Sequence, residues 1–181
     1  MSNIGIIGAH GFLGSYVQDR LDAVALKGRF GWSKKHWQEV AERYDHLDTI
    51  VILARACREN EPRRDIFTIT KEVAGLAKIL RAFHNRRIIY ASSKAVHLGS
   101  QTDIAPISRE DITKMIEVAA RGHLRNRIVN LPTNTRKQTL IIPEVAAETP
   151  YNIYAATKVC GESMVRCCKD YTIFRIWDIT E

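Results

Sequence analysis

Tyr154 and Lys158 are the residues whose types and spacing most directly suggest chemistry. They lie four residues apart in a segment with a helical pattern, so both side chains would occupy one face of a helix. An ammonium beside a tyrosine stabilises the phenolate and lowers the pKa of the tyrosine from its ordinary value of about 10. A tyrosine in this setting could transfer a proton near neutral pH. The alternative is a tyrosine that packs in the core and a lysine that lies on the surface.

A second polar segment contains Ser92 and Ser93 and follows an apolar run that predicts a β-strand over residues 87–91. Open α/β sheets bind their ligands at the carboxyl ends of the strands. A serine hydroxyl at this position could hydrogen-bond a substrate oxygen while Tyr154 donates or accepts the proton. Alternatively, the two serines only end the strand.

Three glycines, Gly8, Gly11 and Gly14, form a GxxGxxG pattern between an apolar run and a predicted helix. Glycines at such steps allow a tight turn, a close approach of the backbone to a pyrophosphate, and close packing of helix on strand. The start of the predicted helix, next to Phe12 and Leu13, would offer unpaired backbone N–H groups and partial positive charge to the phosphates. A strand-to-helix turn needs glycine in any case, but the position after the first strand favours cofactor binding. We therefore predict that these five residues bind a dinucleotide.

The elements that must position these residues alternate along the chain, which is typical of a parallel sheet with crossover helices. Strands are predicted at residues 3–7, within 23–32, and at 49–54, 87–91 and 171–177. Helices are predicted at residues 14–21, 36–44, 65–84, 108–120 and 152–168. Two further apolar runs, 128–131 and 140–142, could pair as a hairpin or form a loop. The fold class is therefore α/β, a Rossmann-like doubly wound parallel sheet in a single domain over residues 1–181.

Five segments together resemble the extended short-chain dehydrogenase/reductase superfamily, in its NAD-dependent epimerase/dehydratase-like branch. They are the glycine pattern and the stretches LDTIVILARA, IIYASSKAV, PYNIYAATKVCGE and YTIFRIWDIT, in the family's order. The resemblance implies that Ser93 polarises the substrate and that Tyr154 is the acid/base. It implies that Lys158 lowers the pKa of that tyrosine and binds the cofactor ribose. It also places Ala54 in the alanine-rich loop that contacts the cofactor.

The chain departs from the family at several points. It ends at Glu181, where the family continues into a C-terminal substrate lobe, and the stretch between residues 14 and 47 is short enough to lose the usual third strand. Glu72 stands where the family commonly has Asn, and His97 replaces a common Tyr. Residues 98–148 form an inserted or elongated segment, which we expect to cover the site in place of the lobe. These departures weaken the catalytic interpretation more than the prediction of the fold.

The choice of cofactor depends on the end of the second predicted strand. Proteins that select NAD tend to place an acidic residue on the ribose hydroxyls there, whereas residues 30–35 contain no acid. Ser33 could hydrogen-bond a 2′-phosphate, and Lys34 or Lys35 could neutralise it. We therefore prefer NADP to NAD as the cofactor, with an ordinary basic loop as the alternative.

Composition bounds the remaining possibilities. The formal net charge of +7 favours an anionic partner. No basic stripe carries interleaved aromatic residues, so we do not expect nucleic acid to be that partner. The four cysteines show no zinc spacing, and we predict no metal site. We expect no membrane association, because no apolar run approaches the ~18 residues of a membrane span. No secretion signal is apparent, which predicts a cytoplasmic protein.

Two functions from different classes follow. The first is an NAD(P)-dependent oxidoreductase or epimerase/dehydratase-like enzyme. It would act on a carbonyl or carbinol carbon of a small-molecule substrate, for which a nucleotide sugar is one candidate. The alternative is a non-catalytic NAD(P)-binding sensor or a protein-interaction module derived from the same family. Loss of the lobe would expose apolar surface, so a homo-oligomer or a protein partner could cover it.

Overall fold

The computed structural model describes residues 3–28, 30–54, 66–93, 96, 107–131, 153–176 and 179–180. Within them a six-stranded sheet has the order β2-β1-β3-β4-β7-β6, and every neighbouring pair is parallel. Its strands are β1 (Ile4–Ile7), β2 (Val24–Leu26), β3 (Thr49–Ile52), β4 (Arg87–Ser93), β6 (Arg127–Leu131) and β7 (Tyr171–Ile176). Two short strands, β5 (Ile107–Ser108) and β8 (Ile179–Thr180), form a separate parallel pair. The predicted doubly wound parallel sheet is confirmed.

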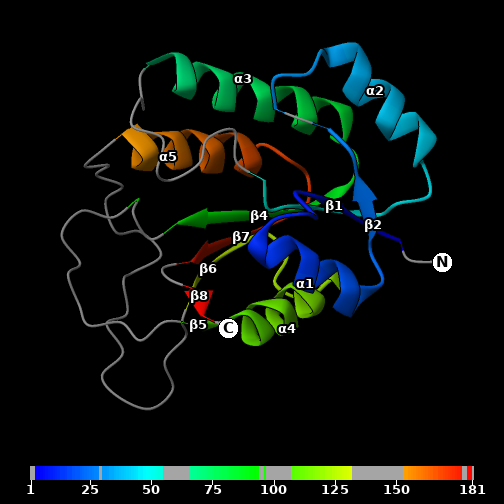
Figure 1. Cartoon of the computed structure of the whole chain (residues 1–181), viewed down its shortest axis with the longest axis vertical. Helices are drawn as coiled ribbons and strands as arrows, with labels where there is room; N and C mark the ends of the chain where they lie inside the picture. Colours follow the sequence, from blue (N-terminus) through cyan, green and yellow to red (C-terminus); the bar gives the residue numbers. More distant parts are fainter. Residues whose placement is uncertain are drawn as a thin grey trace.

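Helices cover both faces of this sheet (Figure 1). One face carries α2 (Lys34–Arg43), α3 (Ile66–Ala82) and α5 (Ile153–Arg166), and the other carries α1 (Phe12–Leu21) and α4 (Arg109–Ala120). Alternate residues of the central strands enter two separate apolar clusters. Ile50 and Ile52 lie on the α3 side, whereas Val51 lies on the α1 side. This double burial explains why the strands are continuously apolar rather than alternating.

Two serines fix where helices begin. Ser33 precedes α2, and its hydroxyl accepts a hydrogen bond from the backbone N–H of His36 at 3.1 Å. Ser108 precedes α4 and accepts from the backbone N–H of Asp111, also at 3.1 Å. Each serine satisfies one of the N–H groups that the first helical turn leaves unpaired. Both are therefore N-caps, so Ser33 has a structural role whether or not it meets a cofactor.

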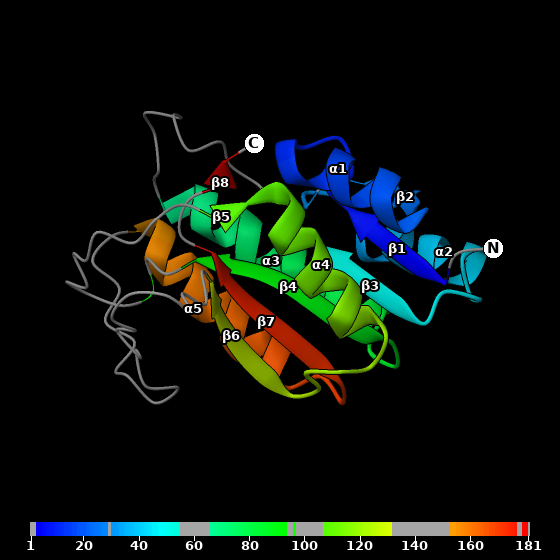
Figure 2. The same ribbon diagram turned by 90° about the horizontal axis from the view of Figure 1, so that it is seen from below.

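The five strands and five helices predicted from the sequence are present, with ends shifted by a few residues. The loop alternative for residues 128–131 is wrong, because these residues belong to β6, which pairs in parallel with β7 at the sheet edge (Figure 2). Ile128 and Val129 are half-buried and pack against opposite apolar clusters. The hairpin with 140–142 stays a prediction. The run 140–142 lies outside the described residues. Between residues 14 and 47, the described part contains β2 as its only strand.

The path from β4 to β7 is unusual. From β4 the chain passes through α4 to β6 at the edge, and then returns through α5 to β7, which lies between them. The β3-to-β4 and β6-to-β7 connections both use a helix on the same face of the sheet, but they cross the sheet in opposite directions. The two crossovers therefore have opposite handedness. Parallel crossovers are nearly always right-handed. The departure inserts α4 and β6 between the serine strand and the Tyr154 helix.

Candidate functional site

The glycine loop, residues 8–14, connects β1 to α1 at the carboxyl edge of the sheet. Gly8 has φ +98°, and a Cβ there would lie 2.6 Å from the backbone nitrogen of Ala54. At Gly14 a Cβ would lie 1.9 Å from the carbonyl oxygen of Gly8. Gly8 therefore permits the turn, and Gly14 permits α1 to approach the loop. Ala54 is half-buried against Gly8, and its own N–H donates to the carbonyl of Ile7 at 3.1 Å.

Gly11 differs from the other two glycines. Its φ of −81° is open to any residue, and the tightest contact of a Cβ there would be 3.3 Å, to the carbonyl oxygen of Gly8. Gly11 is also the N-cap of α1, where it makes no side-chain capping hydrogen bond, and the first turn of α1 contains no acid. The loop thus leaves a bare, electropositive helix start, which fits the diphosphate of a dinucleotide. The fold requires glycine less at position 11 than at positions 8 and 14, whereas a bound diphosphate would need the close backbone approach that Gly11 allows.

The predicted catalytic residues gather where α5 packs against β4. Ser93 is buried at the carboxyl end of β4, Tyr154 is half-buried in the first turn of α5, and Lys158 follows one turn later with 2% of its surface exposed. The ammonium of Lys158 lies 5.8 Å from the centre of the Tyr154 ring. The structure therefore brings the lysine and the tyrosine together, at the same edge of the sheet as the end of the serine strand.

Lys158 points into the protein. Its Nζ donates to the hydroxyl of Tyr90 at 3.4 Å and to the carbonyl of Ala91 at 3.2 Å, and it lies 4.0 Å from a carboxylate oxygen of Glu72. Burial, and then the charge of Glu72, raise the pKa of Tyr90 well above its ordinary value, so Tyr90 is a neutral phenol. Glu72 and Tyr90 were not predicted as site residues. The acid at position 72 of an amphipathic helix was the only signal in the sequence.

A second buried polar cluster lies about one turn beyond Lys158 along α5, around Glu162. The carboxylate of Glu162 receives hydrogen bonds from Arg175 Nε at 2.9 Å and from the Ser92 hydroxyl at 2.5 Å. Glu162 and Arg175 are fully buried. Because Ser92 belongs to β4 and Arg175 to β7, this cluster fixes α5 against both strands.

Ser33 and Lys34 were predicted to bind a 2′-phosphate. They follow β2, whose parallel neighbour β1 leads into the glycine loop, so both segments lie at the same edge of the sheet. Lys34 is exposed, while the Ser33 hydroxyl caps α2 as described above. A hydroxyl that accepts one hydrogen bond can still donate another. The assignment of these two residues stays a prediction.

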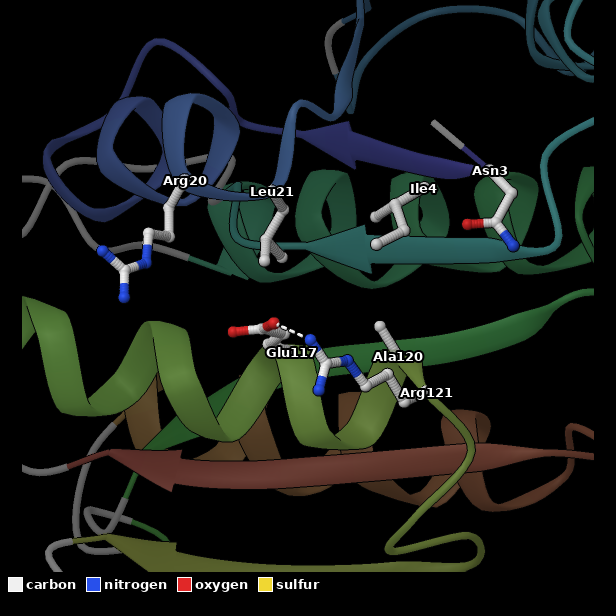
Figure 3. A pocket seen from close by; sticks show the side chains of 7 residues that line it. All are labelled: Asn3, Ile4, Arg20, Leu21, Glu117, Ala120 and Arg121. Carbon is white, nitrogen blue, oxygen red and sulfur yellow. Dashed lines mark hydrogen bonds and ion pairs between the residues drawn. The ribbon is translucent and has the colours of Figure 1, made fainter. Parts of the chain in front are cut away.

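A cavity of about 320 Å³ opens at the opposite end of the sheet (Figure 3). It lies between the carboxyl-terminal ends of α1 and α4 and the start of β1, away from the glycine loop. Its lining residues are Asn3, Ile4, Arg20, Leu21, Glu117, Ala120 and Arg121. None of the predicted site residues contributes to it.

Two kinds of feature are absent from the described residues. Among them, no group of three or more His, Cys, Asp or Glu side chains could hold a metal ion. In the same part of the chain, no helix combines the length and the apolar character that crossing a membrane requires.

No protein-family model matches the chain, and no curated protein sequence matches it. Solved structures do. The chain is similar to UDP-glucose 4-epimerase from Brucella ovis in complex with NAD, with a TM-score of 0.57 at 17% identity over 91% of this chain and 46% of that one. It is similar to RMD from Pseudomonas aeruginosa complexed with NADPH, with a TM-score of 0.61 at 17% identity over 96% and 52%.

A third similar structure is a short-chain dehydrogenase/reductase superfamily protein from Agrobacterium tumefaciens with bound NAD. Its TM-score is 0.56 at 15% identity, covering 95% of this chain and 48% of that one. The chain thus spans about half the length of the solved structures that it matches. At the level of the fold, these likenesses confirm the resemblance to short-chain dehydrogenase/reductases that the motifs predicted.

Proposed function

We propose that this chain, which has the fold of the short-chain dehydrogenase/reductases, binds a nicotinamide dinucleotide through its glycine loop. The observation that carries the proposal is that Gly8, Gly11 and Gly14 do not have the same role. Two of these glycines are required by backbone geometry, and the third leaves a bare helix start that fits a diphosphate. Similar structures hold NAD or NADPH, which supports the same class of ligand.

The proposed reaction is an oxidation, reduction or epimerisation at a carbonyl or carbinol carbon. A bound nicotinamide supplies hydride transfer. The Ser93 hydroxyl would donate a hydrogen bond to the substrate oxygen, and Tyr154 would donate its proton to that oxygen in reduction and accept it in oxidation. The Lys158 ammonium, near the Tyr154 ring, stabilises the phenolate that proton donation leaves.

We propose that the substrate is a nucleotide sugar and that the protein acts in the cytosol. The support is the similarity to a UDP-glucose 4-epimerase and to a Bordetella bronchiseptica enzyme in complex with NAD and UDP. We further propose NADP as the preferred cofactor. Its support is the exposed Lys34 beside Ser33, together with the absence of an acid from residues 30–35.

A second candidate function, a non-catalytic dinucleotide-binding module, is favoured by the position of Lys158. Its ammonium is held by Tyr90, Ala91 and Glu72, and an ammonium has three protons to donate. To bind a cofactor ribose, Lys158 would have to leave at least one of these partners. For such a module we propose a second copy of this chain or another protein as the partner.

The first test is a titration of the purified protein with NADPH and with NADH, followed by cofactor fluorescence. We expect micromolar binding that is tighter for NADPH. Gly11→Ala should weaken binding while the thermal unfolding midpoint stays close to that of the wild type, because its Cβ meets little of the protein. Gly14→Ala should instead destabilise the fold, because its Cβ would overlap the Gly8 carbonyl. Absence of binding by the wild type to either cofactor would overturn the proposal.

A second test separates the two candidate functions. With a nucleotide-sugar substrate panel, Tyr154→Phe should abolish turnover and leave cofactor affinity nearly unchanged. Loss of both properties would show that Tyr154 is structural. A wild type that binds NADPH but turns over no carbonyl or sugar nucleotide would favour the non-catalytic module.

A further inference from the structure

Arg109 is the first residue of α4, and its side chain reaches the start of α1. Its guanidinium carbon lies 4.4 Å from the centre of the Phe12 ring and 5.3 Å from that of Tyr16. Phe12 is the first residue of α1, and 51% of its surface is exposed. A guanidinium over an aromatic face is attracted by the ring. The positive charge of α4 is therefore fixed beside the glycine loop.

The two helices are parallel neighbours. Arg109 and Phe12 bring their amino-terminal ends together, while the opposite ends, with Leu21 and Ala120, line one cavity. Their amino-terminal partial charges, each roughly +0.5, thus lie side by side. The first turn of α1 contains no acid. The first turn of α4 contains two acids, Glu110 and Asp111. Glu110 pairs with Lys114 at 2.9 Å, and Asp111 accepts a hydrogen bond from the Ser108 hydroxyl at 2.8 Å.

A phosphate placed beside the start of α1 would be attracted by each of these positive groups. Arg109 adds a full positive charge where the bare start of α1 is already electropositive. The two acids in the first turn of α4 offset part of the charge of that helix, whereas the first turn of α1 contains none.

Arg109 is also well oriented to receive a phosphate. Its backbone is fixed on one side by the Ser108 N-cap and on the other by Thr113, whose hydroxyl donates to the Arg109 carbonyl at 2.7 Å. The rings of Phe12 and Tyr16 hold the side chain. A planar guanidinium matches phosphate oxygens with two parallel hydrogen bonds, and an ordered side chain loses less entropy on binding.

We propose that Arg109 binds the diphosphate of the dinucleotide. The segment inserted between the serine strand and the Tyr154 helix then supplies part of the cofactor site, by placing α4 beside α1. This inference rests on the proposed function, because it names a further residue of the same site. It differs from the predicted contacts, all of which lie outside residues 98–148.

The test compares Arg109→Gln with Arg121→Gln, a change of equal charge at the other end of the same helix. Arg121 pairs with Glu117 and is far from the glycine loop. NADPH, ADP and adenosine are the probes, the last two in competition with NADPH. For Arg109→Gln we expect about a tenfold or greater loss of affinity for NADPH and ADP, and no change for adenosine. Arg109→Lys keeps the charge and should bind better than Arg109→Gln.

Arg121→Gln should bind all three probes like the wild type. Raising the salt concentration should weaken NADPH binding less in Arg109→Gln than in the wild type, because a charge contact has been removed. If the wild type binds NADPH and ADP, and Arg109→Gln binds them equally well, only this inference is overturned. An equal loss for adenosine also overturns it, because the residue would then act through the fold. A wild type that binds neither NADPH nor ADP overturns the proposed function as well.

Discussion

Replacing Glu162 with alanine is the perturbation with the largest expected effect on stability. Its carboxylate is fully buried and accepts hydrogen bonds from Arg175 Nε at 2.9 and 3.2 Å, from Arg175 Nη2 at 2.5 Å, and from the Ser92 hydroxyl at 2.5 Å. Arg175 is itself fully buried. The substitution removes this carboxylate and leaves the guanidinium of Arg175 buried without the opposite charge of Glu162.

The magnitude follows from these contacts. Removing one partner of a buried ion pair costs about 3–5 kcal/mol of the free energy of unfolding. The Ser92 hydroxyl also loses its acceptor, which adds roughly 1 kcal/mol. The total is therefore about 4–6 kcal/mol. For a chain of this size, each kcal/mol lowers the thermal unfolding midpoint by about 2–4 °C, so we expect a fall of at least ~8 °C.

The assay is equilibrium urea unfolding at pH 7 of the wild type, Glu162→Ala and Glu117→Ala. Glu117 forms a surface ion pair with Arg121, at side-chain exposures of 31% and 69%, and its removal should cost less than about 1 kcal/mol. A double variant, Glu162→Leu with Arg175→Met, should recover much of the loss, because neither charge remains buried. If Glu162→Ala cost no more than Glu117→Ala, the reasoning would be refuted.

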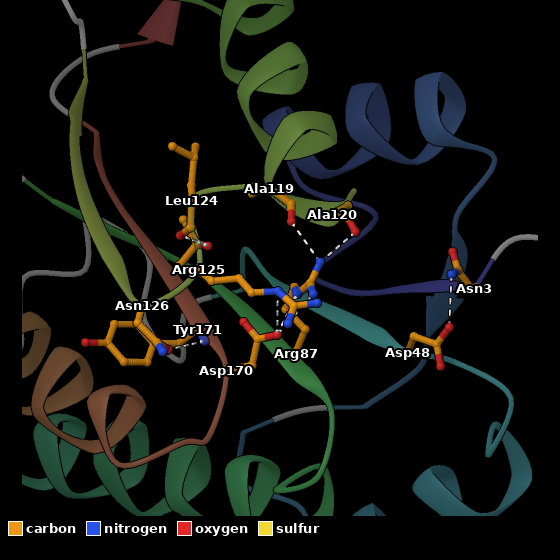
Figure 4. A network of polar contacts seen from close by, with 11 residues as sticks. Asn3, Asp48, Arg87, Ala119, Ala120, Leu124, Arg125, Asn126, Asp170 and Tyr171 are labelled. Carbon is orange, nitrogen blue, oxygen red and sulfur yellow. Dashed lines mark hydrogen bonds and ion pairs between the residues drawn. The ribbon is translucent and has the colours of Figure 1, made fainter. Parts of the chain in front are cut away.

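Two further predictions concern Tyr90 and Arg87. Because burial and then Glu72 raise the pKa of Tyr90, its contribution to stability is complete below pH ~10 and is lost as pH rises further, so wild-type stability should fall above pH ~10 more steeply than that of Tyr90→Phe. Denaturant midpoints from pH 8 to 11 measure this, and parallel curves would contradict it. The guanidinium of Arg87 binds Asp170 at 3.0 Å and the carbonyls of Ala119 and Ala120 at 3.2 and 2.9 Å (Figure 4). Arg87→Met should therefore destabilise the chain by about 2–4 kcal/mol and speed hydrogen exchange at the end of α4. The control is Arg125→Met, which removes a 61%-exposed partner of the same Asp170 carboxylate and should have neither effect.

The strands of the central sheet could be predicted because their signals lie in short, local stretches of sequence. Apolar runs such as residues 49–54 are covered on both faces, and a glycine loop must follow the first strand. The run 128–131 was ambiguous for the opposite reason. Its length and composition suit a hairpin as well as a loop, and its pairing with β7, more than 40 residues later, is not encoded in the local sequence.

The contacts of Lys158 could not be predicted in the same way. The i, i+4 spacing correctly placed it beside Tyr154, because that geometry belongs to one helix. Its hydrogen bond to Tyr90 and its approach to Glu72 join α5 to β4 and α3, which no local pattern encodes. The approach of Arg109 to Phe12 is equally non-local, since it depends on α4 lying beside α1.

The interface between α5 and β4 connects stability to the proposed chemistry. Tyr154, Lys158 and Glu162 are spaced four residues apart. One face of α5 therefore carries the proposed acid/base, its neighbouring lysine and the buried carboxylate that pairs with Arg175. Gly161 lets this face approach the sheet, because a Cβ there would lie 2.5 Å from the Tyr90 hydroxyl. A change at Glu162 should therefore displace the start of α5 as well as destabilise the chain. Buried polar groups cost free energy unless they are paired, and here the pairing fixes the register that the Tyr154–Lys158 chemistry requires.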